Sequence, residues 1–213
     1  MTVMSTPERY PARVVIDFPD RDLDRVSTAL RLFYAIPIVI VLAFLGGNVV
    51  GDASEQSNMT IGALGGGAIV VPAILMIVFR QKYPRWWFDF NLELARFSTR
   101  VGAYLALMTD RYPSTDEEQS IHLEVDYPNV ERDLNRWLPL VKWFLAIPHY
   151  IVLVVLSIAA VFGVIFAWFS IVFTGRYPRG IFNFVEGLVR WALRVQAYAF
   201  LLATDRYPPF SLT

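Results

Sequence analysis

Four aspartates occupy matching places in two related stretches of the chain, where a group of carboxylates could bind a divalent cation. Asp110 and Asp205 belong to two copies of Thr-Asp-Arg-Tyr-Pro, and Asp17 and Asp126 end short apolar runs. Their spacing fits no calcium-binding loop, and an Asp–Arg pair that ends a helix explains the motif more simply. The residues of this repeated motif are Thr109, Asp110, Arg111, Tyr112, Thr204, Asp205, Arg206 and Tyr207.

Other residue types that carry catalysis are scarce. His122 lies in a run that alternates apolar and polar residues, and His149 lies in a long apolar run, where a structural role is simpler than a proton relay. The chain has no cysteine, no Gly-rich phosphate loop after a strand and no Ser-His-Asp arrangement. We therefore expect no catalytic residue, no metal and no cofactor. A lipid-modifying enzyme that uses Asp110 and Asp205 is the enzymatic alternative.

An internal duplication organises the chain around these motifs. The string Tyr-Pro-Arg at 83–85 recurs at 177–179, and a pair of arginines four residues apart recurs at the same offset. Similarity at a fixed offset is typical of repeat proteins. We expect two tandem repeats, over residues 10–113 and 121–210, after a disordered tail at residues 1–9.

Each repeat contains an apolar segment that predicts a transmembrane helical hairpin. In the first repeat a polar, Gly-containing loop divides the apolar residues, which predicts a hairpin over 26–79. In the second repeat, 138–173 is almost unbroken, and one helix of that length would measure about 54 Å, against about 40–45 Å for a bilayer. We therefore expect a second hairpin that turns near 157–163. A single long helix is the alternative.

The placement of basic residues favours two hairpins. All 19 Lys and Arg residues lie outside 32–79 and 143–175. Basic segments stay on the cytoplasmic side of a membrane, and an odd number of crossings in either half would place Arg176 and Arg179 on the other side. We therefore expect a multi-pass protein of the bacterial inner (cytoplasmic) membrane with both termini cytoplasmic.

An Arg-bearing amphipathic helix is expected after each hairpin, at 86–108 and 181–203. An arginine at the bilayer centre costs a few kcal/mol, so these helices should lie in the cytoplasmic interface. Intramembrane arginines that line a pore are the alternative. The side chains expected to contact lipid headgroups are Arg85, Trp86, Trp87, Arg96, Arg100, Arg179, Arg190, Trp191 and Arg194.

The fold class that follows is an all-α membrane protein of two tandem repeats, each a transmembrane helical hairpin followed by an interfacial amphipathic helix. Two short runs, 13–18 and 121–127, have strand-like character and could pair with each other on the cytoplasmic surface. Gly62 and Gly66 have the spacing of a helix-packing motif, which indicates oligomerisation.

Three strings resemble a bacterial family known only as a membrane domain of unknown function, which is common in actinobacteria and often present as tandem copies. They are Phe-Thr-Gly-Arg-Tyr-Pro-Arg-Gly at 173–180, Arg-Trp-Ala-Leu-Arg-Val-Gln-Ala-Tyr at 190–198 and Thr-Asp-Arg-Tyr-Pro-Pro-Phe at 204–210. The second half is closer to the family pattern, since the first half lacks Gly after Tyr-Pro-Arg and carries an inserted polar loop. The resemblance implies a bacterial inner membrane location and brings no activity with it.

These observations predict a non-enzymatic bacterial inner-membrane protein, a scaffold or accessory subunit that interacts with anionic lipid and a membrane partner. It would belong to a homo-oligomer or a larger membrane complex. A net charge of zero, with 55% hydrophobic residues, predicts no nucleic-acid partner. The alternative function is a small oligomeric channel or transporter, motivated by the glycine spacing and the internal repeat.

Overall fold

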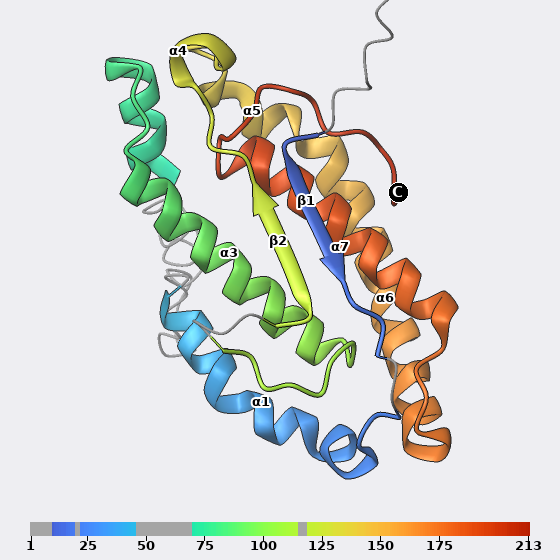
Figure 1. Cartoon of the computed structure of the whole chain (residues 1–213). Coiled ribbons are helices and arrows are strands. Elements are labelled where there is room, and N and C mark those ends of the chain that lie inside the picture. The colour runs from blue at the N-terminus through green and yellow to red at the C-terminus, as the bar shows by residue number, and fades with distance from the viewer. Residues whose placement is uncertain (1–9, 20–21, 46–69, 115–118) are drawn as a thin grey trace, which may run out of the picture.

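The computed structural model describes residues 10–19, 22–45, 70–114 and 119–213, and these are mostly helical (Figure 1). A helix over Val70–Arg80 ends in the π-helical turn η1. The elements in chain order are β1 (Ala12–Ile16), α1 (Arg25–Leu45), η1 (Met76–Arg80), α3 (Arg85–Leu105), β2 (Ile121–Val125), α4 (Val130–Asp133), α5 (Pro139–Leu145), α6 (Ile147–Thr174) and α7 (Arg179–Ala199).

The two strands pair antiparallel, with Val14 opposite Leu123, so the predicted pairing is confirmed. Alternation sends Val14 and Leu123 into the core and leaves the opposite face of the sheet polar. On that outer face Arg13 contacts Glu124 at 3.7 Å and Asp126 at 3.6 Å. The exposed, charged face identifies one water-facing side of the molecule.

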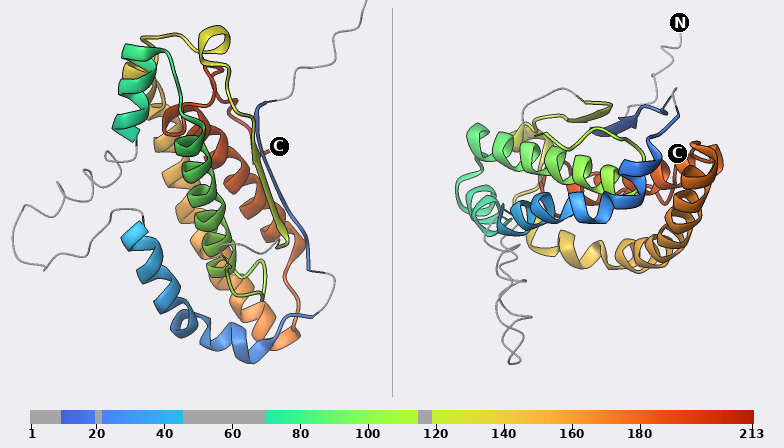
Figure 2. Two further views of the ribbon diagram at one scale, coloured as in Figure 1. Left: turned by 60° about the vertical axis from the view of Figure 1, so that its left-hand side comes forward. Right: turned by 90° about the horizontal axis from the view of Figure 1, so that it is seen from below.

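The elements form three layers, which Figure 2 shows in its right-hand view. The sheet lies on α3 and α7, and α1 and α6 pack on the other side of these two helices. The main core fills the space between the sheet and the middle helices and continues to the small residues Ala160 and Ala167 of α6. The side of α1 and α6 that faces away from the core is apolar and exposed.

Helices α6 and α7 and strand β1 run alongside one another. At one end Trp191 of α7 bonds to His149 of α6, and the Tyr10 hydroxyl bonds to the backbone carbonyl of Arg194. Toward the other end, Gly163 of α6 lies against Ile181 of α7. The sheet and α6 therefore lie side by side along the length of α7, which separates them.

The predicted hairpin over 138–173 is wrong, because α6 continues without a turn through 157–163. The most helix-weakening residue there is Gly163, and one glycine costs only about 1 kcal/mol. Pro148 lies in the first turn of α6, where a missing N–H is tolerated. The chain breaks earlier, at Ala146 between α5 and α6.

Several first-half predictions fall outside the described residues. They concern the tail at 1–9, the loop of the hairpin over 26–79, and the glycines Gly62 and Gly66. Helices α1 and Val70–Arg80 lie on either side of that gap.

The amphipathic helices form close to where they were expected, as α3 and α7, but they are covered on two sides. Each is covered on one side by a strand and on the other by a long apolar helix. Of the side chains expected to meet lipid headgroups, Arg96 of α3 bonds to the sheet and Arg190 of α7 bonds to the C-terminal segment, whereas Trp191 packs against α6. The structure therefore places α3 and α7 in a middle layer, and their position in a membrane interface stays a prediction.

Candidate functional site

A buried lysine in α5 organises the end of the second half. The Lys142 side chain is 0% exposed, and its ammonium donates to the Thr204 carbonyl at 2.6 Å and pairs with Asp205 at 2.7 Å. The ammonium also lies 5.2 Å from the centre of the Tyr198 ring, within cation–π range. Burial lowers the pKa of Lys142, while the hydrogen bond and the charge of Asp205 act to raise it.

The first half contains the same arrangement around an arginine. The Arg31 guanidinium, 2% exposed, pairs with Asp110 and donates to the carbonyls of Thr109 at 2.8 Å and Tyr104 at 3.1 Å. It also lies over the Tyr104 ring, 4.6 Å from its centre. In each half a cation from the first apolar segment is therefore bound by the Thr-Asp-Arg-Tyr-Pro motif and a tyrosine of the amphipathic helix.

The backbone directs these carbonyls toward the cations. Leu107 and Leu202, just before each motif, have φ of 64° and 53°. A left-handed conformation is uncommon for a residue with a branched side chain. Both leucines are buried, so packing of the side chain holds the turn. The turn reverses the chain after α3 or α7 and brings the Thr carbonyl and the Asp carboxylate to the same cation.

Both carboxylate oxygens of each motif aspartate have a partner in these anchors. One carboxylate oxygen of Asp110 accepts the backbone N–H of Asp24, and one of Asp205 accepts that of Asn135. The other oxygen of each pairs with the buried cation. Within the described residues no group of three or more His, Asp or Glu side chains is placed to hold a metal ion. The observed role of the motif is to lock the first apolar segment onto the end of the amphipathic helix.

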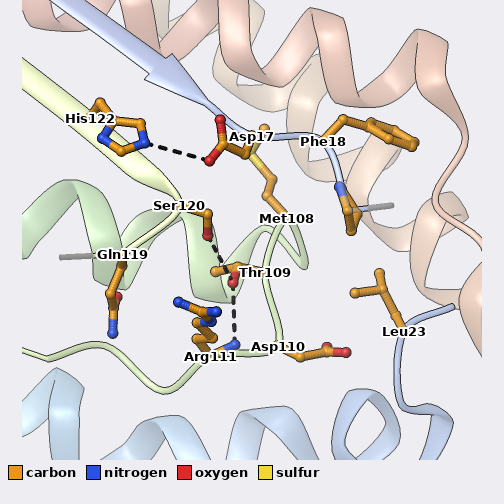
Figure 3. A pocket seen from close by; sticks show the side chains of 11 residues that line it. Asp17, Phe18, Leu23, Met108, Thr109, Asp110, Arg111, Gln119, Ser120 and His122 are labelled. Carbon is orange, nitrogen blue, oxygen red and sulfur yellow. Dashed lines mark hydrogen bonds and ion pairs between the residues drawn. The ribbon is translucent and has the colours of Figure 1, made fainter. Parts of the chain in front are cut away.

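Beside the first motif lies an open polar pocket of about 620 Å³ (Figure 3). The end of β1, the loop after α3 and the start of β2 form its walls. On one side of it Asp17 and His122 lie 3.5 Å apart, and the Ser120 hydroxyl reaches that of Thr109 at 3.5 Å. The side chains that line it are Asp17, Phe18, Pro19, Leu23, Met108, Thr109, Asp110, Arg111, Gln119, Ser120 and His122.

A second pocket of about 600 Å³ lies beside the second motif, at matching sequence positions. Asp126 replaces Asp17, and Asp205 replaces Asp110. Its lining residues are Pro11, Asp126, Tyr127, Pro128, Asp133, Ala203, Thr204, Asp205 and Arg206. The four aspartates singled out in the sequence therefore line two separate pockets, two in each.

The residues expected at lipid headgroups fall into two groups. Trp86 is 64% exposed. Arg85, beside it at the start of α3, and Arg179, at the start of α7, are also exposed. In contrast, Trp191 is 4% exposed, and Arg100 and Arg194 are also buried, which argues against direct headgroup contact for these three.

The remaining members of that set also serve internal contacts. Arg96 donates to the Leu123 carbonyl of β2 at 3.0 Å, and Arg190 pairs with Glu186 at 2.8 Å. Arg100 donates to the Ser114 carbonyl, and Arg194 donates to carbonyls of the C-terminal segment. Trp87 is half-buried. The arginines of α3 and α7 thus stabilise the fold around the sheet and the C-terminal segment.

The contacts of His149 within the described residues indicate a structural role. Its Nδ1 accepts the Trp191 indole N–H at 3.1 Å, and its ring stacks on Phe210 with centroids 4.0 Å apart. These contacts hold the C-terminal segment against α6 and α7. His122 is exposed, as expected for the outer face of β2.

Sequence analysis missed the anchoring role of Arg31 and Lys142. The signal was present, because each immediately precedes a long run without Lys or Arg. Each also lies ten residues after the first residue of an Arg-Asp-Leu string, at 21–23 and 132–134. It also missed two buried tyrosines that connect the halves. Tyr83 donates to the Leu201 carbonyl at 2.9 Å, and Tyr177 donates to that of Ala106 at 3.1 Å.

The fold is thus a mostly helical one with a small two-stranded sheet and two helices, Arg25–Phe44 and Ile147–Thr174, that are long and apolar enough to cross a membrane. Length and composition alone identify these two helices. Residues 137–211 match the model of a domain of unknown function (DUF4389), and no second copy is detected. The match spans α5, α6, α7 and the second Thr-Asp-Arg-Tyr-Pro motif. No curated protein and no solved structure matches the chain.

Proposed function

We propose that this protein is a non-enzymatic membrane protein of the bacterial inner membrane, a scaffold or accessory subunit that binds anionic lipid and a membrane partner. The observation that carries the proposal is the exposed apolar side of α1 and α6. Large hydrophobic side chains stay exposed along both helices, among them Phe33, Ile40, Ile151, Phe162 and Phe173. An apolar surface of this extent needs a lipid or protein partner.

Aromatic and basic side chains form a border at the end of a further apolar helix, Val70–Arg80. Phe79, at the end of the helix Val70–Arg80, is exposed, and the exposed Arg80, Lys82, Arg85 and Trp86 follow it. This order of apolar, basic and aromatic side chains is typical of a membrane interface. Each basic residue near an anionic surface adds about 1 kcal/mol to binding. Anionic lipid is therefore the expected ligand of this border.

We also infer that the two halves are tandem copies of one unit. Each end of the sheet then has an equivalent pocket, and two equivalent pockets on one chain support a scaffold role. The two cation anchors and the crossed tyrosine bonds support this inference. So does the backbone: Gln81 and Gly175, both after an apolar helix, have φ of 48° and 77°. Under this interpretation α1 and Val70–Arg80 together correspond to α5 and α6, interrupted by an insertion.

Flotation with vesicles tests the proposal. The full-length protein should bind vesicles that contain phosphatidylglycerol more tightly than pure phosphatidylcholine vesicles, and added salt should weaken the difference. The double variant Arg80→Gln/Lys82→Gln should reduce binding to anionic vesicles by about 10- to 30-fold, at about 1 kcal/mol per charge.

The matched control is Arg13→Gln, which removes an exposed charge on the outer face of the sheet. Arg13 lies on the opposite side of the molecule from α1 and α6, so its loss should leave vesicle binding nearly unchanged. Binding that ignored both anionic lipid and salt would refute the proposed lipid interaction. Equal losses in the control and the double variant would refute the proposed interface.

A further inference from the structure

We propose that the protein enters only one leaflet of the bilayer, with α1 and α6 lying in the membrane plane and the sheet facing water. The inference rests on the proposed membrane binding and specifies its geometry. Its partner is the interfacial region of a single leaflet. It replaces the crossing helices that the sequence alone predicts.

The first argument comes from what lies beside α6. Strand β1 and helix α7 run along α6, as the contacts His149–Trp191, Gly163–Ile181 and Tyr10–Arg194 establish. If α6 crossed the bilayer, the sheet would lie at hydrocarbon depth together with it. A two-stranded sheet has an open edge on each side, and open edges do not occur in contact with lipid because their N–H and C=O groups lack partners.

The charged side chains of the sheet strengthen this argument. Arg13, Glu124 and Asp126 are exposed on its outer face, and His122 and Asp17 continue the row. Glu186 and Arg190 of α7 lie just beneath, with Glu186 close to the backbone N–H of Ile16. Ionised groups are expelled from the hydrocarbon core. With α6 in the membrane plane, all of these charges face the aqueous phase.

The second argument comes from the basic residues at the two ends of α6. Because α6 is one continuous helix, a crossing would place Arg132 and Arg136 on one side of the membrane and Arg176 and Arg179 on the other. The positive-inside tendency opposes that arrangement. The positive-inside tendency predicts that all basic residues lie on one side of the membrane. Since α6 does not turn back on itself, it meets this prediction only if it lies in the membrane plane.

Helix α6 has the surface that such a position needs. Ile151, Phe162 and Phe173 are 63%, 68% and 73% exposed. They lie eleven residues apart, about three turns, and therefore on one face. The opposite face packs on α7 and α1. An in-plane helix buries such a face about 5–10 Å into the boundary between headgroups and acyl chains.

Single-cysteine labelling tests the geometry directly, since the natural chain has no cysteine. The variants Ile151→Cys, Phe162→Cys and Phe173→Cys carry an environment-sensitive fluorophore in vesicles of phosphatidylcholine and phosphatidylglycerol. Lipids brominated at different acyl positions report the depth of each label. The matched control is Glu124→Cys on the exposed face of the sheet. Circular dichroism of each labelled variant checks that the fold is retained.

We expect the three α6 labels to show equal, shallow depths and the Glu124→Cys label to resist quenching by any brominated lipid. A label at position 162 close to the bilayer centre, with labels at 151 and 173 in opposite headgroup regions, would overturn the in-plane position while leaving membrane binding intact. Labels that remain in water at all four positions would overturn both this inference and the proposed membrane binding.

Discussion

Removal of the buried cation Lys142 is the most informative perturbation of the fold. Lys142→Met deletes the ammonium that pairs with Asp205 and donates to the Thr204 carbonyl. Among the described residues, Asp205 then keeps its charge with the Asn135 N–H as its remaining hydrogen-bond partner. Breaking a buried pair in this way costs about 3–5 kcal/mol. Asp205→Asn should cost a similar amount, because it leaves the buried ammonium without a counter-charge.

The double variant Lys142→Met/Asp205→Asn should be much less destabilised than the sum of the two single variants. At 2.7 Å the attraction is about 6 kcal/mol for an effective dielectric constant of about 20. Removing both ions from water costs several kcal/mol each, so the pair is close to neutral overall. The lowered pKa of Lys142, caused first by burial, agrees with a large desolvation cost. We expect the double variant to lose about 1–3 kcal/mol, chiefly for the unpaired Thr204 carbonyl.

Denaturant unfolding in detergent micelles, followed by tryptophan fluorescence, measures the free energy of unfolding of the natural protein, the two single variants and the double variant. The sum of the two single losses exceeds the loss expected for the double variant by at least about 3 kcal/mol, so a coupling energy of about 3 kcal/mol or more would support the anchor. Additive effects, with the double variant at the sum of the singles, would refute it.

The pH dependence offers an independent check on the same pair. Since the folded pKa of Lys142 lies below its unfolded value, the unfolded chain binds more protons between the two pKa values. The contribution of Lys142 to stability therefore rises with pH up to about 10.4, its ordinary pKa. In Asp205→Asn the stabilising charge is gone, so this rise should begin at a lower pH than in the natural protein. An unchanged profile would contradict this account.

Three further predictions follow from named contacts. Arg31→Lys should lose about 1 kcal/mol by sacrificing one of its hydrogen bonds, and Arg31→Met about 3–5 kcal/mol, both measured by denaturant unfolding. Gly187→Ala should release the C-terminal segment to limited proteolysis, because a Cβ there would lie 2.7 Å from the Leu212 carbonyl oxygen; Gly180→Ala, with open space around it, should not. Tyr83→Phe and Tyr177→Phe should each cost about 1–3 kcal/mol of thermal or denaturant stability by leaving the Leu201 or Ala106 carbonyl without its donor, and unchanged stability in both would contradict the crossed bonds.

The sequence was informative where a local pattern decides the structure. The period-2 run at Ile121–Val125 gave a strand, and the helical spacing of Arg190 and Arg194 gave α7. It failed where packing of distant segments decides. Nothing local shows that the sheet covers α3 and α7. Nothing local shows either that Trp191 is buried against His149 of α6 and Phe210 of the C-terminal segment.

The choice between a hairpin and a long helix at 138–173 shows a different limit. The argument for a turn compared helix length with bilayer thickness, and so assumed that the helix crosses the bilayer. The sequence between Ser157 and Gly163 contains no residue that would force a turn, and α6 continues through it. A helix that does not cross is under no limit from bilayer thickness, so its 28 residues need no explanation by a turn.

The positions of Arg31 and Lys142 connect this geometry to the anchors. Each cation lies near the start of an apolar helix, buried against the motif that follows α3 or α7. The Arg31 pair therefore fixes α1 to the middle layer, to which the sheet is attached, and the Lys142 pair fixes α5, which leads directly into α6. A crossing helix could tilt independently of a cytoplasmic domain, whereas these anchors hold α1 and α6 against α3 and α7. Loss of either anchor should therefore change the depth of labels on the same half more than on the other half, a difference that a purely local loss of stability would not produce.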